Sequence, residues 1–267
     1  MSDQYIPQDQ TSSSPRERKV IDDEEFKRMM KAAEPSFMEK YGANLVTYIL
    51  IAINVIVFFV EMLVSGFRTS ISAQVLYEMG AMFAPAIASP LDWYRFVAPM
   101  FLHVDLMHLL FNMAALFSAG YLLERMLGRW NYLLLYFIAG ISGNVMCYAV
   151  DMYTGEFVVS AGASTSVFGL FIAVALLGVL SKRNRGFLLQ YSKGMLAVIG
   201  VNILYTLLSP GVSVFGHLGG ALGGFVAMFM VPSKNLRVPT VARIVVSGIW
   251  VVLIGFVLAS SLGYGLP

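Results

Sequence analysis

The chain has 267 residues, of which 58% are hydrophobic and 13% are charged, and its net charge is +2 at neutral pH. Soluble domains average about 25% charged residues, so this composition excludes a disordered protein and a nucleic-acid-binding module and argues against a soluble enzyme. The length provides room for six or seven membrane spans. The single Cys147 excludes an intrachain disulfide.

Residues 1–43 differ from the rest of the chain because they are polar and charged. Residues 1–15 are rich in Ser, Gln and Pro, and residues 20–40 mix acids and bases around a few apolar side chains, which favours a short amphipathic helix. The segment contains no apolar run of the signal-peptide type and is too short for a core of its own. We expect a largely flexible cytoplasmic tail.

Seven apolar segments long enough to cross about 30 Å of hydrocarbon follow this tail. They lie at about 44–66, 106–126, 132–152, 163–180, 195–209, 214–231 and 241–262. The fifth segment is short unless residues 187–192 extend it. The predicted fold is an all-α, polytopic helical bundle with a six-span core over 44–231. Residues 232–267 are expected to supply a linker and a seventh, C-terminal transmembrane helix.

Basic residues are distributed unequally between the two sides of these spans. With the N-terminus inside, 16 Lys and Arg residues lie on the cytoplasmic side, and only Arg68 and Arg95 lie outside. The positive-inside rule then predicts a cytoplasmic N-terminus and an outer C-terminus. The outer loop, 67–105, is too long for a simple connector, so we expect it to lie in the interface or to cover a site. The lack of a targeting sequence favours the cell (cytoplasmic) membrane over an organelle.

Polar side chains gather at the heads of three predicted spans, where they are costly in lipid and indicate a functional site. They include His103, His108, Asn112, Ser164 and His217. Taken singly, a Ser or an Asn in a span more often bonds to its own helix or to a neighbouring one. Spans 2, 4 and 6 run in the same direction, however, so a nucleophile, a base and an amide donor are expected roughly 3–9 Å below one membrane face. This joint pattern favours nucleophilic catalysis.

Metal binding is not expected at these histidines. His103 and His108 are five residues apart, so their side chains diverge by about 140° on a helix. A zinc site on one helix uses His at i and i+4, as in H-E-x-x-H, and the sequence has no such motif.

Glycines in the sixth span favour close helix packing. The pairs Gly219/Gly223 and Gly220/Gly224 have the four-residue spacing that lets two helix backbones approach each other. If spans 4 and 6 are the helices that approach, the imidazole at the head of span 6 comes within hydrogen-bonding reach of the hydroxyl at the head of span 4.

At these residues the chain resembles the rhomboid family of intramembrane serine proteases. The motifs that carry the resemblance are Trp93-Tyr94-Arg95, His103-x4-His108-x3-Asn112, Gly162-Ala163-Ser164 with Gly169 five residues on, and Gly216-His217-Leu218-Gly219-Gly220. They follow the family's order and spacing over about residues 44–231, and the seventh span is similar to the family's 6+1 arrangement. The chain departs from the family pattern where Thr165 follows the serine, a position that is often Gly, and where the loop reads Trp-Tyr-Arg instead of Trp-Arg.

The resemblance implies an intramembrane serine endopeptidase, a hydrolase that cleaves peptide bonds in or beside transmembrane segments of membrane proteins. It implies that Ser164 is the nucleophile and that His217 is the general base and then the general acid. Its implied partners are transmembrane protein substrates and the lipid bilayer. No cofactor, metal or nucleic acid is expected.

The resemblance also implies roles for the residues around this Ser/His dyad. His108, Asn112 and the backbone N–H of the serine are the implied donors to the oxyanion. Phe168 is expected to pack against the catalytic imidazole, and Gly162 and His103 are expected to support the site.

Two alternatives stay open. One is an inactive rhomboid-like protein that binds or escorts membrane proteins, although such relatives lose the serine or the histidine and this chain has both. The other is a seven-span receptor, retinal protein or transporter. A retinal protein needs a Lys in its last span, and 241–262 has none, while a transporter favours polar groups at the middle of the membrane.

Overall fold

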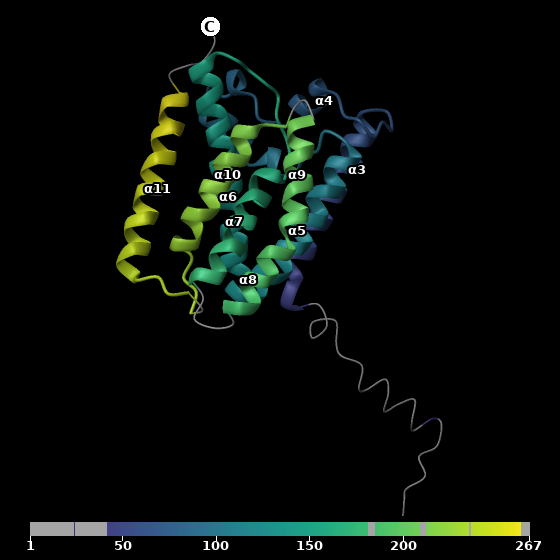
Figure 1. Ribbon diagram of the computed structural model, residues 1–267. Helices are drawn as coiled ribbons and strands as arrows, with labels where there is room; N and C mark the ends of the chain where they lie inside the picture. Colours follow the sequence, from purple (N-terminus) through teal and green to yellow (C-terminus); the bar gives the residue numbers. More distant parts are fainter. Residues whose placement is uncertain (1–23, 25–41, 181–184, 209–211, 235, 263–267) are drawn as a thin grey trace, which may run out of the picture. The chain divides into compact units, whose positions relative to one another are not determined.

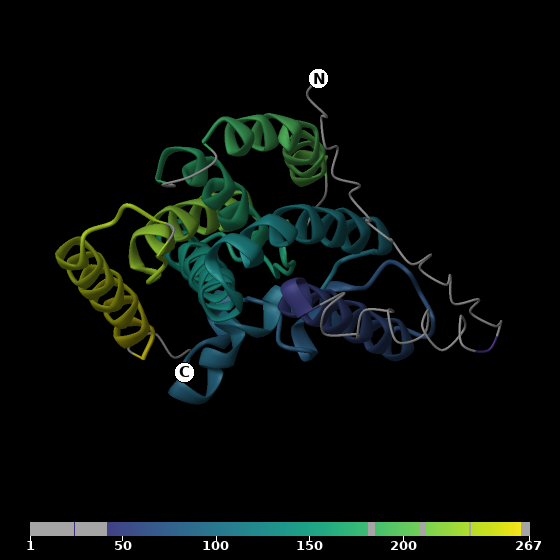
Figure 2. The ribbon, with the colours of Figure 1, turned by 90° about the horizontal axis from the view of Figure 1, so that it is seen from below.

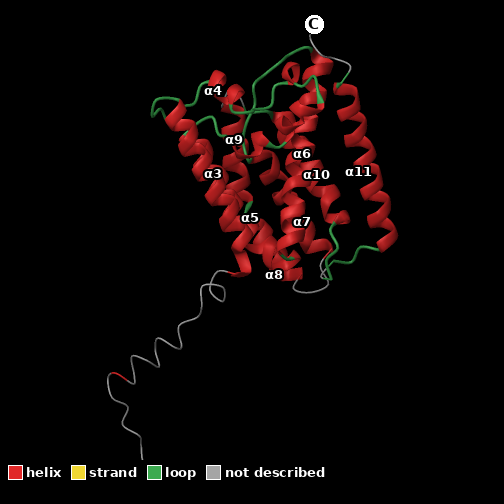
Figure 3. Cartoon of the chain, turned by 180° about the vertical axis from the view of Figure 1, so that it is seen from behind, coloured by secondary structure: helices red, strands yellow, loops and turns green. Residues whose placement is uncertain are grey.

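The computed structural model divides into two compact units, Met1–Lys40 and Tyr41–Pro267. The residues it describes are Glu24, 42–180, 185–208, 212–234 and 236–262. The tail expected over residues 1–43 lies almost entirely outside the described residues, so it stays a prediction. Within the described ranges every regular element is a helix (Figure 3), apart from two isolated β-bridges in the loops.

Seven apolar helices make up the bundle in the described part of the second unit. They are α3 (Leu45–Val64), α5 (Leu106–Leu127), α6 (Arg129–Thr154), α7 (Ser164–Leu180), α9 (Leu196–Leu208), α10 (Val214–Met230) and α11 (Thr240–Ser261). The shorter elements are η1 (Gly42–Asn44), α4 (Ala73–Glu78), η2 (Ala84–Ala86), η3 (Pro90–Phe96), η4 (Ala98–Phe101) and α8 (Arg185–Gly194). The fold class predicted from the sequence, an all-α polytopic membrane protein, is confirmed.

The apolar helices fall into two length classes. α5, α6, α11 and the η1–α3 segment have 22 to 26 residues and are long and apolar enough to cross a membrane. α7, α9 and α10 are apolar but have 17, 13 and 17 residues. At 1.5 Å per residue they extend about 20–26 Å, which is less than a hydrocarbon core of about 30 Å. Four described helices are therefore long and apolar enough to be membrane spans. The predicted count of six spans plus a seventh stays a prediction.

The fifth predicted span begins with a bend. α8 ends at Gly194 and α9 begins two residues later, and Figure 2 shows the two helices meeting at a steep angle. Residues 187–192 therefore belong to a separate helix and do not lengthen the span. The Tyr191 hydroxyl donates a hydrogen bond of 2.7 Å to the Ser118 carbonyl oxygen, which fastens α8 to α5.

α6, α7 and α10 pack against one another at the centre of the bundle, while α3 and α9 pack on α5. α11 packs on α10 and stands at one side of the bundle (yellow in Figure 1). We call the end of the bundle at which α3 ends and α5, α7 and α10 begin the loop face, because residues 65–105 and 155–163 lie there.

Two glycine stripes on α10, each a pair of glycines four residues apart, allow α10 to pack closely on α6 and on α7. A Cβ atom at Gly220 would overlap the carbonyl oxygen of Thr165, and one at Gly224 would overlap the backbone of α7 farther along. A Cβ atom at Gly219 would overlap α6, and one at Gly223 would lie 2.6 Å from a side chain of α6. The Gly220/Gly224 pair thus faces α7 and the Gly219/Gly223 pair faces α6. The approach of spans 4 and 6 that the sequence left conditional is present.

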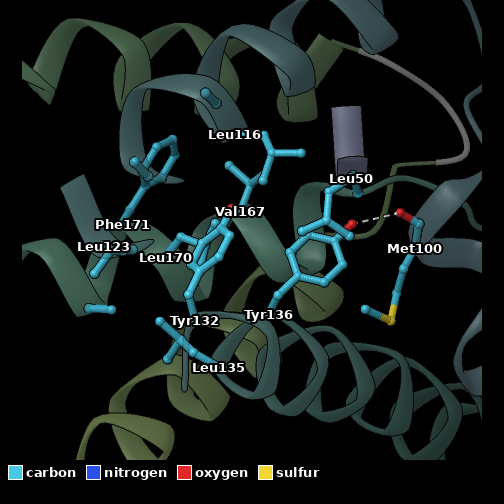
Figure 4. Packing of buried hydrophobic residues seen from close by; sticks show 14 of the residues in the cluster. Leu50, Met100, Leu116, Leu123, Tyr132, Leu135, Tyr136, Val167, Leu170 and Phe171 are labelled. Atoms are coloured by element: carbon cyan, nitrogen blue, oxygen red, sulfur yellow. Dashed lines mark hydrogen bonds between the residues drawn. The ribbon is translucent and has the colours of Figure 1, made fainter. Parts of the chain in front are cut away.

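Large side chains fill the core between α5, α6 and α7. Figure 4 shows Tyr136 of α6 among leucine, valine and phenylalanine side chains from the neighbouring helices. Its hydroxyl donates a hydrogen bond of 3.2 Å to the Met100 carbonyl oxygen in η4. A buried hydroxyl needs such a partner, so this bond ties the segment before α5 to the core.

The long loop between α3 and α5 is held by its own polar contacts. The Arg95 guanidinium donates from Nη1 to the carbonyl oxygens of Tyr77 at 3.0 Å and Ala81 at 2.9 Å. At the start of η3 the Ser89 hydroxyl donates to the Asp92 carboxylate at 2.8 Å, and this bond holds the pKa of Asp92 below its ordinary value. A loop fixed in this way can position neighbouring residues. The expectation that it lies in the interface or covers a site stays a prediction.

Candidate active site

A serine and a histidine meet where two central helices begin. Ser164 is the first residue of α7, and His217 lies in the first turn of α10. The Nε2 atom of His217 is 2.6 Å from the Oγ atom of Ser164, and both side chains are buried. The Gly220 stripe described above allows this distance, because it brings the first turns of α7 and α10 together. The structure therefore joins the two residues that the sequence predicts as nucleophile and base.

An aromatic ring fixes the orientation of this imidazole. Phe168 lies one helical turn after Ser164, and its ring stacks on that of His217 with centroids 4.1 Å apart and planes 10° from parallel. A parallel stack limits tilting of the imidazole by contact and needs no hydrogen bond. The structure thus places Phe168 where the sequence analysis expects it.

The other imidazole nitrogen bonds to a residue that the sequence analysis missed. The Oγ1 atom of Thr206, on α9, is 2.9 Å from Nδ1 of His217, and the threonine is buried. Within the described residues both ring nitrogens of His217 are therefore paired with hydroxyls and neither with a carboxylate. A Ser-His-Asp triad has a carboxylate at this nitrogen, and here a hydroxyl takes its place. The only sequence signal for Thr206 was that it is a polar side chain in an apolar span.

A glycine separates His108 from the serine hydroxyl. Gly162 has a φ of +143°, which L side chains rarely adopt, and its N–H donates to the Pro99 carbonyl oxygen at 2.9 Å. A Cβ atom there would lie 2.6 Å from Cε1 of His108 and 3.0 Å from Oγ of Ser164. Both the backbone conformation and the space require glycine, and the His108 ring consequently approaches the serine.

Asn112 follows His108 by one helical turn and is fully buried. Its amide donates one N–H to the His108 carbonyl oxygen at 2.8 Å, which leaves its second N–H for another acceptor. The Oδ1 atom of Asn112 and both ring nitrogens of His108 have no hydrogen-bond partner in the part of the chain that is described. Buried polar groups normally have partners, so this cluster is suited to receive a polar group from outside the protein.

His103 lies farther from the serine. Its buried ring contacts that of His108, with centroids 5.3 Å apart, and its backbone N–H donates to the Glu61 carboxylate at 3.0 Å. The His103 ring is therefore linked to the site by its contact with the His108 ring. Glu61, a buried acid on α3, was not singled out from the sequence, because one acid near the end of an apolar span resembles an interfacial residue.

The first turn of α7 adds a further element. The first N–H groups of an α-helix have no acceptor within the helix and form the positive end of its dipole. Since α7 starts at Ser164, negative charge that develops beside this serine lies at a favourable place. The fold and the site together define a polytopic helical membrane protein with a buried, hydrogen-bonded Ser–His pair of the kind used in nucleophilic catalysis.

Comparison with known proteins gives the family. The model of the Rhomboid domain matches residues 90–234, more than half of the chain, and the chain belongs to the rhomboid family. The resemblance predicted from the motifs is confirmed, and the matched range contains both Ser164 and His217.

Similar proteins with names occur in several different organisms. Rhomboid protease GluP of Bacillus subtilis (strain 168) is 33% identical over 186 residues, which are 70% of this chain and 34% of GluP. Rhomboid protease AarA of Providencia stuartii is 27% identical over 228 residues, 77% of this chain and 80% of AarA. Rhomboid-like protease 3 of Toxoplasma gondii is 31% identical over 166 residues, 61% of this chain and 60% of the relative. The aligned part of the chain thus spans only about a third of the length of GluP.

Proposed function

We propose that this chain is an intramembrane serine endopeptidase that hydrolyses peptide bonds in or beside the transmembrane segments of other membrane proteins. The observation that carries the proposal is the 2.6 Å hydrogen bond between Ser164 Oγ and His217 Nε2 in a chain of the rhomboid family. Relatives named as proteases, among them GluP and AarA, support the same activity.

The proposed reaction follows from the two side chains. Ser164 Oγ attacks the carbonyl carbon of the scissile peptide bond while His217 Nε2 takes the hydroxyl proton. His217 then gives that proton to the leaving amine as the acyl-enzyme forms. A water molecule attacks the ester in the second half of the reaction, and the imidazole again serves first as base and then as acid.

The proposed oxyanion site consists of His108, Asn112 and the backbone N–H of Ser164. It is supported by the unused N–H of Asn112, by the unpaired ring nitrogens of His108 and by the space that Gly162 leaves between His108 and the serine. Loss of one such donor typically costs about 3 kcal/mol of transition-state stabilisation.

We also propose a cytoplasmic N-terminus, an outer C-terminus and a location in the cell membrane, with the loop face outside. The distribution of Lys and Arg supports this orientation. It places the Ser–His pair near the outer surface, where water is available. A cavity of about 530 Å³ at the loop face, lined by Asp105 and Leu208 among others, supports entry of water from that side.

The test combines a chemical probe with substrate cleavage. A fluorophosphonate should label the wild type and leave Ser164→Ala unlabelled, and both Ser164→Ala and His217→Ala should reduce cleavage of a panel of single-span substrates by at least about 10³-fold. Ser166→Ala is the matched control, because Ser166 is a buried serine of the same helix turn and forms no hydrogen bond with His217. It should retain labelling and cleavage.

The competing function is that of an inactive rhomboid-like protein that binds or escorts membrane proteins. It predicts that the wild type is neither labelled nor able to cleave any substrate of the panel. That result would overturn the proposed function.

A further inference from the structure

The hydroxyl of Thr206 lies within hydrogen-bonding distance of two groups, a backbone carbonyl oxygen and the His217 imidazole. Its Oγ1 atom is 2.7 Å from the carbonyl oxygen of Asn202, one turn earlier in α9, and 2.9 Å from Nδ1 of His217. Both distances are normal hydrogen-bond lengths. The threonine thus connects the backbone of α9 to the imidazole that bonds Ser164.

Counting protons decides the direction of each bond. A hydroxyl has one proton, and a carbonyl oxygen can only accept, so the 2.7 Å contact uses the proton of Thr206. Thr206 Oγ1 must then accept from His217, which requires a proton on Nδ1. A neutral imidazole with its proton on Nδ1 has its lone pair on Nε2, the nitrogen that lies 2.6 Å from Ser164 Oγ.

We propose that Thr206 is a positioning residue that holds His217 in the tautomer able to accept the proton of Ser164. This inference rests on the proposed function, and it assigns to a neutral hydroxyl on α9 the orienting task that a carboxylate performs in a Ser-His-Asp triad. When the imidazole takes the serine proton, the Nδ1–H bond to Thr206 persists, so the ring need not turn during the reaction.

The surroundings of Thr206 keep its hydroxyl in place. The side chain is β-branched and bonded to its own helix, which restricts its rotamer. α9 itself is attached beside the site, because the Tyr205 hydroxyl donates to Asp105 at 2.6 Å and the Tyr205 ring stacks on His108 with centroids 5.1 Å apart. The donor role of Thr206 toward Asn202 also polarises its oxygen and strengthens its acceptance from Nδ1.

Water cannot readily replace this hydroxyl. A cavity of about 240 Å³ adjoins Thr206 and His217, and the rest of its lining is apolar, including Phe168, Ile203 and Leu218. A buried water needs two to four polar partners. A water molecule that entered after loss of the hydroxyl would find the imidazole and the Asn202 carbonyl oxygen, the lower limit of this range, in an otherwise apolar lining, so the loss should affect His217 directly.

The kinetic test uses two substitutions of Thr206. Thr206→Val preserves the branched shape and removes the hydroxyl, and it should lower kcat about tenfold with KM unchanged, the effect of one hydrogen bond. Thr206→Ser retains the hydroxyl and should restore most of kcat. Thr154→Val is the matched control, because Thr154 makes the same bond to the carbonyl four residues earlier, at 2.9 Å, but lies exposed at the end of α6. It should behave as the wild type.

A spectroscopic test reads the tautomer without activity. The chain has three histidines, so ¹⁵N NMR of histidine-labelled protein, with His217→Ala for assignment, can identify the protonated nitrogen of His217 in detergent at alkaline pH. The wild type and Thr206→Ser should carry the proton on Nδ1, and Thr206→Val should lose this preference. A wild type protonated on Nε2, or a Thr206→Val protein with unchanged tautomer and kcat, would overturn the proposal.

The two proposals fail separately. If the wild type neither cleaves substrates nor reacts with the fluorophosphonate, the proposed protease function is wrong, and the NMR comparison still decides whether Thr206 sets the tautomer.

Discussion

α10 and α11 are both apolar helices, but the glycines of α10 lie at close helix contacts and those of α11 lie in open space. In α10 the glycines are buried, and a Cβ atom at Gly220 would overlap the backbone of α7. In α11 a Cβ atom at Gly248 or Gly255 would meet nothing within 4 Å, and no residue of its most apolar window is buried. Apolar sequence alone therefore does not determine how closely a helix packs. The position of the His217 imidazole depends on α10 and is independent of the glycines of α11.

α11 is held to the bundle at a few polar points. The indole N–H of Trp250 donates to the Ser142 hydroxyl of α6 at 2.9 Å, and that of Trp93 in η3 donates to Ser261 at 3.3 Å. Arg243, near the start of α11, donates to the Val231 carbonyl oxygen just after α10. Large side chains such as that of Phe256, 71% exposed, point away from the protein. In a membrane these side chains face lipid, which solvates them as well as a protein core does.

Among the substitutions that test this difference between α10 and α11, Gly220→Ala should have the largest effect on turnover and stability. The added methyl group must push α10 away from the carbonyl of Thr165, which lies beside Ser164. A displacement near 1 Å of a catalytic group can cost about 10²-fold in rate, and overpacking a close helix contact costs about 1–3 kcal/mol. We expect at least a 10²-fold loss of kcat and a lower midpoint of thermal unfolding in detergent.

Phe168 and Thr206 provide internal reporters for this variant. If α10 moves, the stack on Phe168 and the bond to Thr206 should weaken together, which fluorophosphonate labelling rates and histidine ¹⁵N shifts would both register. Retained kcat in a folded Gly220→Ala protein would show that α7 and α10 are not held by the glycine stripe.

Sequence patterns could predict the helices and single out the serine and the histidine because each has a local signature. Apolar runs locate the spans, and the common direction of spans 2, 4 and 6 places the serine and the histidine near one membrane face. The sequence leaves open whether spans 4 and 6 approach each other, and the packing of α10 on α7 decides it. The sequence could not assign the two glycine pairs to their partners, since Gly219 and Gly220 are neighbours and only the packing decides that one faces α6 and the other α7.

Thr206 illustrates what a sequence leaves undetermined. A threonine in an apolar helix normally bonds to its own backbone, and Thr206 does so with Asn202. Its second contact, to His217, depends on the placement of α9, a 13-residue helix that follows a bend. The sequence also left open whether residues 187–192 extend the fifth span, which was predicted to begin at about residue 195, and the bend after Gly194 shows that they form a separate helix.

An intermediate effect is expected for Trp250→Phe. This change removes the bond to Ser142 and replaces the indole with a smaller aromatic ring, so the free energy of unfolding should fall by about 1 kcal/mol from the lost bond and by a further small amount from the lost contact surface. Turnover should stay within about twofold of the wild type, since the Ser–His distance depends on α7 and α10. Unfolding in mixed micelles and cleavage by the same preparation measure both quantities, and a large loss of turnover would show that α11 supports the site through α6.

The smallest effect is expected for Gly248→Ala, the counterpart of Gly220→Ala on the exposed helix. The position has free space, so the methyl group meets no neighbour. Alanine also loses less backbone entropy than glycine on forming a helix, which favours the folded state by about 0.5–1 kcal/mol. We expect a slightly higher thermal midpoint and unchanged kcat. Gly255→Ala, in the same open setting, should repeat the result. A loss of stability at both positions would mean that another surface covers α11 in the membrane, and the contrast with α10 would then reflect a missing neighbour instead of a difference in packing.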